Sequence, residues 1–470
     1  MIMHRYELYI LTLLSLLFAG CQIQPVNGSV AIDIPANWDQ QTENVSTWPA
    51  QDWWKGFGNT ELNQLMISAQ NNNYDLAAAA TRVLQAEAQA RLAGVALLPN
   101  VDLSASSGQQ GVFGGENNVD ASNSFGISLG ASYEIDFWGK NRANLTAAQE
   151  SLHASQFDRE TIAITITSNV AIAYLQVLSL RERLAIAQLN LANAERVLKL
   201  VESRVKYGAV SPLDLAQQRA VVARQRTSIP PLEQQERDAR SVLAILLGRP
   251  PQGFDVNNTS LESIALPEVG AGMPSELLTR RPDIQTAEAQ LRAANANIAA
   301  ARAAYFPSIR LTGSSGVQST ALAALFDGGL IYNLVASLAQ PIFDAGRLEA
   351  EEDLALARRE ELIQFYRSTI INAFADVETA LGTIQSTAEQ QNYQTEELEQ
   401  AEIAFQLAER RYREGAEDLL TVLDAQRTLF SAQDQYQLIR FARLQSLVTL
   451  FRALGGGWQL ENESYAQSLQ

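Results

Sequence analysis

The feature that most restricts the fold is one uninterrupted helical segment, residues 140–207. It contains no proline or glycine, the two residues that most often end a helix. Its apolar residues recur at alternating steps of four and three, the spacing of a coiled-coil seam. The seam consists of Ile166, Val170, Ala173, Val177, Leu180, Leu184, Ala187, Leu191, Ala194, Leu198, Val201 and Val205. A helix of about 67 residues is about 100 Å long, so the chain must form an elongated bundle.

The chain carries one order of predicted elements twice: a helix, a strand pair, a long helix and a return helix. The first repeat, 59–251, is expected to contain a β-hairpin over 100–136, the long helix 140–207 and a return helix over 213–247. The second, 275–455, is expected to contain a β-hairpin over 308–340, a long helix over 347–412 and a return helix over 418–454. Because Gly208 and Gly415 occupy matching places 207 residues apart, the sequence predicts a tandem duplication.

Prolines are expected to end one helix of the first repeat and to interrupt another. The first helix is expected to run from near Asn59 to about Leu98, where Pro99 ends it. Pro230 and Pro231 lie inside the return helix, and a proline removes a backbone donor and crowds the preceding turn. We therefore expect the return helix to be interrupted and kinked at this point.

Both strand pairs alternate between an apolar and a polar face. In the first pair Phe125, Ile127 and Leu129 alternate with Gly126, Ser128 and Gly130. Four such strands cannot close a barrel, and an apolar row left in water would promote aggregation. Three copies supply twelve strands, so the expected fold is mainly α with β: a trimeric lipid-embedded β-barrel, four strands per protomer, continuous with a long α-helical barrel. A water-soluble sandwich is the alternative, but Ser and Gly suit a wet lumen better than a core.

The N-terminus has the pattern of a signal peptide over residues 1–20. Its apolar run of about 11 residues is too short to span a bilayer, and no later segment has the run of about 20 apolar residues that a transmembrane helix needs. The run ends at Leu17-Phe18-Ala19-Gly20-Cys21, which resembles the bacterial lipobox, in which the cysteine is acylated. We expect 21–58 to be a lipidated tether, 252–274 a linker and 456–470 a C-terminal tail. An ordinary signal peptide with an unmodified Cys21 is the alternative.

Composition excludes several functions. The net charge of −17 argues against nucleic acid and anionic membrane surfaces, which bind clustered Lys and Arg. With His4 and His153 the only histidines and Cys21 the only cysteine, His/Cys metal clusters and Cys-His catalysis are nearly excluded. No nucleophile or phosphate-binding motif is present. We expect no enzyme, no cofactor and no metal.

Several motifs together resemble the TolC superfamily, in particular the OprM/NodT-type outer-membrane lipoproteins of tripartite efflux pumps. They are Trp53-Trp54 with Phe57, Leu278-Thr279-Arg280-Arg281-Pro282-Asp283, Ala304-Tyr305-Phe306-Pro307, Pro341-Ile342-Phe343-Asp344-Ala345-Gly346 and Leu423-Asp424-Ala425-Gln426-Arg427. The resemblance covers essentially the whole mature chain. It implies a homotrimer in outer-membrane lipid, lipid-anchored, whose periplasmic extension docks on an adaptor (membrane fusion) protein and an inner-membrane transporter of the resistance-nodulation-division type.

The resemblance also implies roles for residues near the closed end of the channel. It places an aspartate ring at the constriction, with which Asp424 aligns. Arg427, at i+3, is expected to pair with Asp424, although a surface pair of negligible energy is the plainer reading. Asp214 and Tyr412 align with residues whose hydrogen bonds hold the closed state. Gly208 and Gly415 are first of all expected to form the turns between two helices. Their role in docking the adaptor follows only from their position at the tips.

Two departures from the pattern limit these assignments. Some relatives carry a second aspartate where this chain has Thr421, so a second acidic ring is not predicted. Glu417 stands where some relatives have an arginine, so that part of the lock is expected to be missing. The predicted function is a passive exit duct for small molecules. The alternatives are the exit duct of a type I protein secretion system and, from another class, a non-conducting coiled-coil scaffold of the envelope.

Overall fold

The computed structural model describes residues 32–39, 48–111 and 121–459. The predicted signal peptide, Cys21 and residues 460–470 of the predicted tail lie outside the described residues. The described chain divides into two compact units. The first comprises residues 83–111, 121–154 and 287–366, and the second comprises residues 32–39, 48–82, 155–286 and 367–459.

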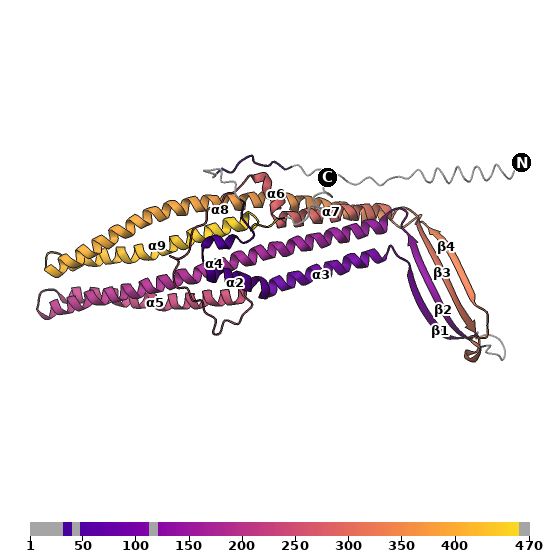
Figure 1. Cartoon of the computed structure of the whole chain (residues 1–470), viewed down its shortest axis with the longest axis horizontal. Helices are drawn as coiled ribbons and strands as arrows, with labels where there is room; N and C mark the ends of the chain where they lie inside the picture. The colour runs from indigo at the N-terminus through magenta and orange to yellow at the C-terminus, as the bar shows by residue number, and fades with distance from the viewer. Residues whose placement is uncertain (1–31, 40–47, 112–120, 460–470) are drawn as a thin grey trace. The chain divides into compact units, whose positions relative to one another are not determined.

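Among the described residues helices dominate, and one antiparallel sheet accompanies them (Figure 1). In chain order the elements are η1 Trp53–Phe57, α2 Thr60–Asn72, α3 Tyr74–Val95, β1 Asn100–Gly111, β2 Ala121–Ile135, α4 Lys140–Lys206, α5 Pro212–Leu246, η2 Pro274–Glu276, α6 Leu277–Arg280, α7 Pro282–Ala303, β3 Ser308–Ser319, η3 Leu322–Ala324, β4 Ile331–Ala339, α8 Arg347–Glu414 and α9 Leu419–Ala453.

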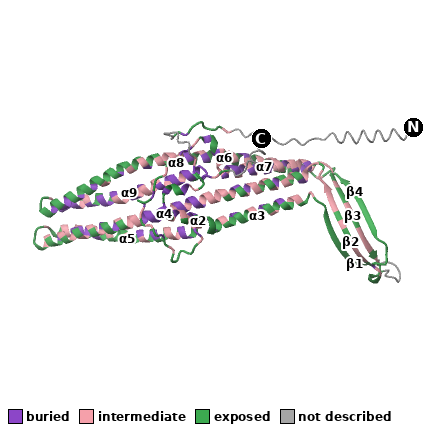
Figure 2. Cartoon of the chain, viewed as in Figure 1, coloured by how far each residue is buried: buried purple, intermediate pink, exposed green. Residues whose placement is uncertain are grey.

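The sheet of the first unit has the order β1-β2-β3-β4, so the two hairpins are joined by the pairing of β2 with β3. The register separates an apolar face from a polar face in β1 and β2 and does so less strictly in β3 and β4, where Val335 lies on the polar face opposite Thr312. Leu103 lies opposite Leu129 on the apolar face, whereas Ser104 lies opposite Ser128 on the polar face with their hydroxyls 2.9 Å apart. The outer strands β1 and β4 are exposed throughout (Figure 2), so each leaves one edge unpaired in the described chain.

A repeated aspartate starts both long helices of the duplication. Asp136 accepts hydrogen bonds from the backbone N–H groups of Asn141 and Arg142 at 2.8 and 2.9 Å. Asp344 lies three residues before α8, as Asp136 lies four residues before α4, and it accepts from the Leu348 N–H at 3.0 Å. Such bonds satisfy backbone donors that the first turn of a helix leaves free.

The second unit surrounds the middle of α4 with a continuous hydrophobic core. Val170, Tyr174 and Leu178 of α4 are fully buried, and they pack in one cluster with η1, α2, α5 and α9. The ring of Trp53 stacks on Phe451 with centroids 4.8 Å apart. Figure 2 shows buried residues concentrated where α2 meets α4.

The segment predicted as a linker is ordered and bonded to α4. The Arg181 guanidinium bonds the carboxylates of Glu236 and Asp255 and the carbonyl of Val256, the last at 2.7 Å. Glu182 accepts from the Leu261 N–H at 2.8 Å. Adjacent charged residues of the long helix therefore fix the connection between the two repeats.

The first helix of each repeat is broken, which the sequence analysis did not predict for residues 59–98. The break falls at Asn73 between α2 and α3, and at Arg281 between α6 and α7. Asn73 donates to the Leu246 carbonyl at 2.8 Å, and Arg281 donates to the Ala453 carbonyl at 3.0 Å. Each break residue thus caps the C-terminal end of its own repeat's return helix.

The predicted interruption at Pro230 and Pro231 is wrong. The structure forms one α-helix, α5, with both prolines inside it. Both prolines are exposed, as are Arg226 and Thr227 four residues before them. The carbonyls that the prolines leave without a donor therefore reach water, which lowers the cost of keeping the helix continuous.

One described helix, α4, contains an 18-residue window long and apolar enough to cross a membrane by length and composition alone. Of that window 56% is buried inside the protein. The core helix of a large bundle passes the same test, and the packing of α4 against the other helices of the second unit accounts for its apolar residues.

Candidate functional site

The two helix–turn–helix tips of the second unit contain every residue that the sequence analysis assigned to the gate. The first tip joins α4 to α5 at Gly208, and the second joins α8 to α9 at Gly415; their φ values are 74° and 81°. In each tip the glycine N–H donates to the carbonyl three residues earlier at 3.0 Å, and the next alanine N–H donates five residues back at 2.8 or 2.9 Å. This is the Schellman motif, which favours glycine because its φ is positive.

Each outgoing helix of the tips begins with a side-chain cap. In the first tip, Asp214 accepts from the Ser211 N–H at 2.8 Å while its own N–H donates to the Ser211 hydroxyl at 3.3 Å, forming a capping box. In the second, Asp418 accepts from the Thr421 N–H at 2.9 Å. Hydrogen bonds from the Thr421 backbone and hydroxyl lower the pKa of Asp418, which keeps a negative charge at this helix N-terminus.

Tyr412 is the largest buried side chain of the tip core. It is 1% exposed, and its hydroxyl has no hydrogen-bond partner among the described residues. Within one chain Asp214 and Tyr412 share no described hydrogen bond, since Asp214 is bonded to Ser211. The Arg204 guanidinium of α4 instead lies over the Tyr412 ring, 4.5 Å from its centroid.

Asp424 and Arg427 lie one turn apart on α9 and form the predicted ion pair. Their side chains are 63% and 71% exposed. An exposed pair on one helix contributes little to stability. Both groups therefore keep most of their surface available to solvent or to another molecule.

Three arginines of α4 connect the first repeat to the second, and the sequence analysis identified none of them. Besides Arg204, Arg196 bonds both carboxylate oxygens of Glu409 at 3.0 and 2.9 Å, and Arg183 bonds those of Asp434 at 2.7 and 3.2 Å. Two-point bonds of this kind fix orientation as well as charge. The partners lie more than 200 residues apart in sequence, so local spacing carries no signal for them.

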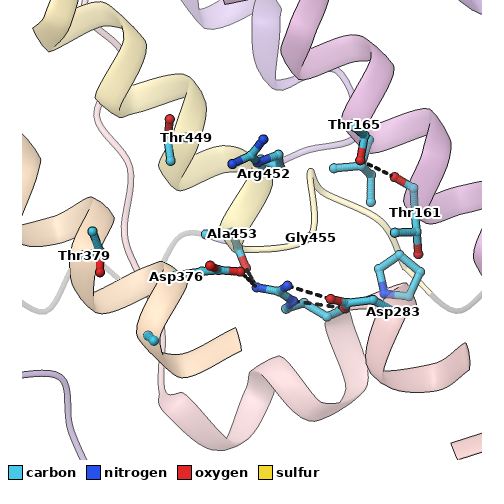
Figure 3. Close-up of a pocket in the computed structure, with 13 residues that line it drawn as sticks. Thr161, Thr165, Asp283, Asp376, Thr379, Thr449, Arg452, Ala453 and Gly455 are labelled. Carbon is cyan, nitrogen blue, oxygen red and sulfur yellow. Dashed lines mark hydrogen bonds and ion pairs between the residues drawn. The ribbon is translucent and has the colours of Figure 1, made fainter. Parts of the chain in front are cut away.

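A cavity of the second unit, about 480 Å³, lies beside the α6–α7 break (Figure 3). Arg281 lines it and donates to both carboxylate oxygens of Asp283, at 3.0 and 2.6 Å, and to Asp376 at 3.0 Å. Burial disfavours the charged form, but these carboxylates outweigh it and raise the pKa of Arg281. Arg281 therefore joins α7, α8 and α9 through Asp283, Asp376 and the Ala453 carbonyl.

Metal binding finds no support in the described part of the chain, where no group of three or more His, Cys, Asp and Glu residues could hold an ion. The tips instead combine exposed charge with rigid turns.

Known proteins with the same sequence pattern show which family has this arrangement. The family model described as outer membrane efflux protein matches residues 65–249 and again residues 273–456.

The chain belongs to the outer membrane efflux protein family. The family model matches it twice, in agreement with the predicted duplication. The pyoverdine export outer membrane protein OpmQ of Pseudomonas putida is 47% identical over 458 residues, covering 96% of this chain and 97% of the relative. The cation efflux system protein CusC of Escherichia coli K12 is 33% identical over 451 residues, covering 94% and 98%.

Solved structures agree with the assignment of this chain to the outer membrane efflux protein family. The outer-membrane channel OprN has a TM-score of 0.86 at 27% identity, with 94% of this chain and 100% of that chain covered. A CusC structure has a TM-score of 0.82 at 32% identity, with 93% and 100% covered. The TolC-like channel fold, the location in the outer membrane and the efflux-channel function without enzymatic activity, all predicted from the sequence, are confirmed.

Proposed function

We propose that three copies of this chain close the four-stranded sheet into one barrel in the outer membrane. The unpaired edges of β1 and β4 would then pair between copies. The support is the exposed apolar row of the sheet, in which Leu103 is 72%, Leu334 is 81% and Leu338 is 69% exposed. Lipid is a favourable environment for such a row only if every strand edge is paired.

The same proposal assigns the repeats 59–251 and 275–455 to one wall of a water-filled duct. Acylation at Cys21, with 21–58 as a tether, would anchor each copy in the membrane. Mass spectrometry of the purified protein tests this part. A mature N-terminus at Cys21 that carries acyl chains is expected, and an unmodified thiol there contradicts it.

The partners proposed for the duct are a periplasmic adaptor and an inner-membrane transporter of the resistance-nodulation-division type. Docking at the tips is supported by large apolar side chains left exposed there: Tyr207 is 79%, Leu213 is 65% and Leu420 is 65% exposed. Exposed apolar residues grouped around rigid turns are typical of protein interfaces. Gly208 and Gly415 hold the turns that present these side chains.

The proposed gate consists of Asp424 and Arg427, with Asp214 and Tyr412 on the two tips. Three aspartates facing one lumen would repel one another, attract cations and respond to a partner that neutralises them. The exposure of Asp424 supports this role. The Tyr412 hydroxyl is buried without a partner among the described residues, so a rearrangement that opens the tip would be able to give it one.

The proposed cargo is a small molecule, and the identity of 47% to the pyoverdine export protein OpmQ favours pyoverdine or a related compound over cations. The test is expression of this chain in a Pseudomonas putida strain that lacks its own OpmQ. Restored export of pyoverdine into the medium is the expected result. If export stays absent while the protein reaches the outer membrane, the cargo is different. Export of a protein instead would indicate a type I secretion duct.

A further inference from the structure

A groove of about 470 Å³ lies between α4, α5 and α9 of the second unit. Its lining includes apolar side chains: Ile186, Ala187, Val221, Leu232, Leu423 and Phe430. Its size falls within the range of about 300 to 1,000 Å³ that small-molecule sites occupy. An apolar floor with a few polar groups is also typical of such sites.

Positive charge exceeds negative charge in this groove. Arg183, Arg224 and Arg427 line it, against the single carboxylate of Asp434. Arg183 is bonded to Asp434, and Arg427 to Asp424 at the groove's margin. The excess is unusual because the whole chain has a net charge of −17.

Two groups of the groove are left without partners. The Arg224 guanidinium has no ion pair or hydrogen bond within the described chain, although it lies on a helix whose neighbouring arginines Arg219 and Arg226 are both paired. Asn190 is 3% exposed, and its side-chain oxygen is buried without a partner. A buried acceptor without a donor costs free energy that a ligand hydroxyl or amide would recover.

We propose that this groove binds small organic anions with two or more carboxylates. Arg224 is assigned as the anchor, because its planar guanidinium matches a carboxylate in two-point geometry. Arg183 and Arg427 contribute attraction, and Asn190 accepts a hydrogen bond from the ligand. The cavity beside the α6–α7 break is of similar size but lacks this excess, since Arg281 and Arg452 face Asp283 and Asp376.

The consequence for transport rests on the proposed duct function. An acidic channel repels anionic cargo, whereas a local basic site raises its concentration where it binds. Conduction also requires binding weak enough to allow release. A groove in which one arginine has no partner within the described chain meets both conditions. An acidic helix of a partner protein is the competing occupant, but a stable protein interface needs about 800 Å² from each partner, which a groove of this size does not offer.

The test measures binding of citrate to the purified full chain in detergent at low ionic strength, by equilibrium dialysis with labelled citrate. Arg224→Gln is expected to weaken citrate binding about tenfold. The matched control is Arg226→Gln, two residues away on α5, which removes the same charge from a side chain paired with Glu195 at 2.7 Å outside the groove. It is expected to leave binding within about twofold of the natural protein, as for an exposed charge.

Three results of this experiment would contradict the proposed anion site. They are no citrate binding by the natural protein, equal losses in the two variants, or binding of an acidic helical peptide where citrate does not bind. Thermal unfolding of each variant shows whether the fold is intact, and Val221→Trp, which fills the groove without changing charge, should also block citrate. Bilayer conductance of the same samples separates the two proposals. Conductance without citrate binding would contradict the anion site and leave the proposed duct intact. Citrate binding that depends on Arg224, without conductance, would contradict the duct and leave the site intact.

Discussion

At the scale of single residues, Arg204 is the side chain that joins the two tips of one protomer. It extends from the last turn of α4 to cover the Tyr412 ring. It also approaches the turn of the second repeat, since a Cβ on Gly415 would lie 3.3 Å from its Nη2. Nothing in the local sequence identifies this partner, because the contact depends on how the two repeats pack.

Replacing Arg204 with glutamine is expected to loosen the tips. The cation–π contact on the buried Tyr412 ring contributes about 1–2 kcal/mol, so the global fold should survive. Limited proteolysis should cut the turn at Gly415 faster in Arg204→Gln than in the natural protein. Arg219→Gln, which removes an exposed pair between α5 and Glu202 of α4, is the control and should change little. Equal cleavage in both variants would argue against the link.

The two tip glycines form a matched pair for a second test. Alanine at either position must adopt a positive φ, at a cost of about 1–2 kcal/mol. No atom lies within 4 Å of the place that the alanine methyl group would take at position 208, whereas at Gly415 the Arg204 guanidinium must also move. Gly415→Ala should therefore lower the unfolding temperature more than Gly208→Ala. The reverse order would mean that the Arg204 contact is absent in solution.

At the scale of elements, the start of α4 depends on Asp136. Its carboxylate is 8% exposed and satisfies two backbone N–H groups. Asp136→Ala is expected to reduce the free energy of unfolding by about 1–2 kcal/mol, measured by chemical denaturation followed by circular dichroism. Asp136→Asn keeps an acceptor and should recover much of the loss. If the asparagine variant is as unstable as the alanine variant, capping is not the cause.

The elements show what the sequence was able to predict. The long helices follow from uninterrupted runs with a regular apolar seam, and the strands from strict alternation, because both patterns are local. The break at Asn73 has a local signal that was missed, because the Asn73 side chain accepts from the N–H groups of Asp75 and Leu76 and so caps α3. Its bond to Leu246, 173 residues away, has no such signal. The interruption at Pro230 was predicted because proline removes a backbone donor inside a helix. Where the helix is exposed, water can bond the carbonyl that loses this donor, and the helix continues. Of the site, Asp424, Asp214 and Tyr412 came from resemblance, and the arginine contacts to the second repeat came only from the structure.

At the scale of the whole molecule, the sheet is the part that one chain leaves incomplete. Both outer strands have an unpaired edge in the described chain, and the apolar face is exposed. Detergent-solubilised protein is therefore expected to have the mass of three chains by sedimentation. Substituting Leu334 with aspartate should reduce the yield of trimer in membranes, because a charge is costly in contact with lipid. The same change at Ser104, on the polar face, should be tolerated.

Conductance of the purified full chain in a planar lipid bilayer distinguishes a channel from a scaffold. We expect discrete conductance steps from trimers, with ion selectivity altered by Asp424→Ala and a larger open fraction in the double variant Tyr412→Phe with Asp214→Ala. Soluble monomers that give no conductance, even with the double variant, would contradict the channel and favour an envelope scaffold.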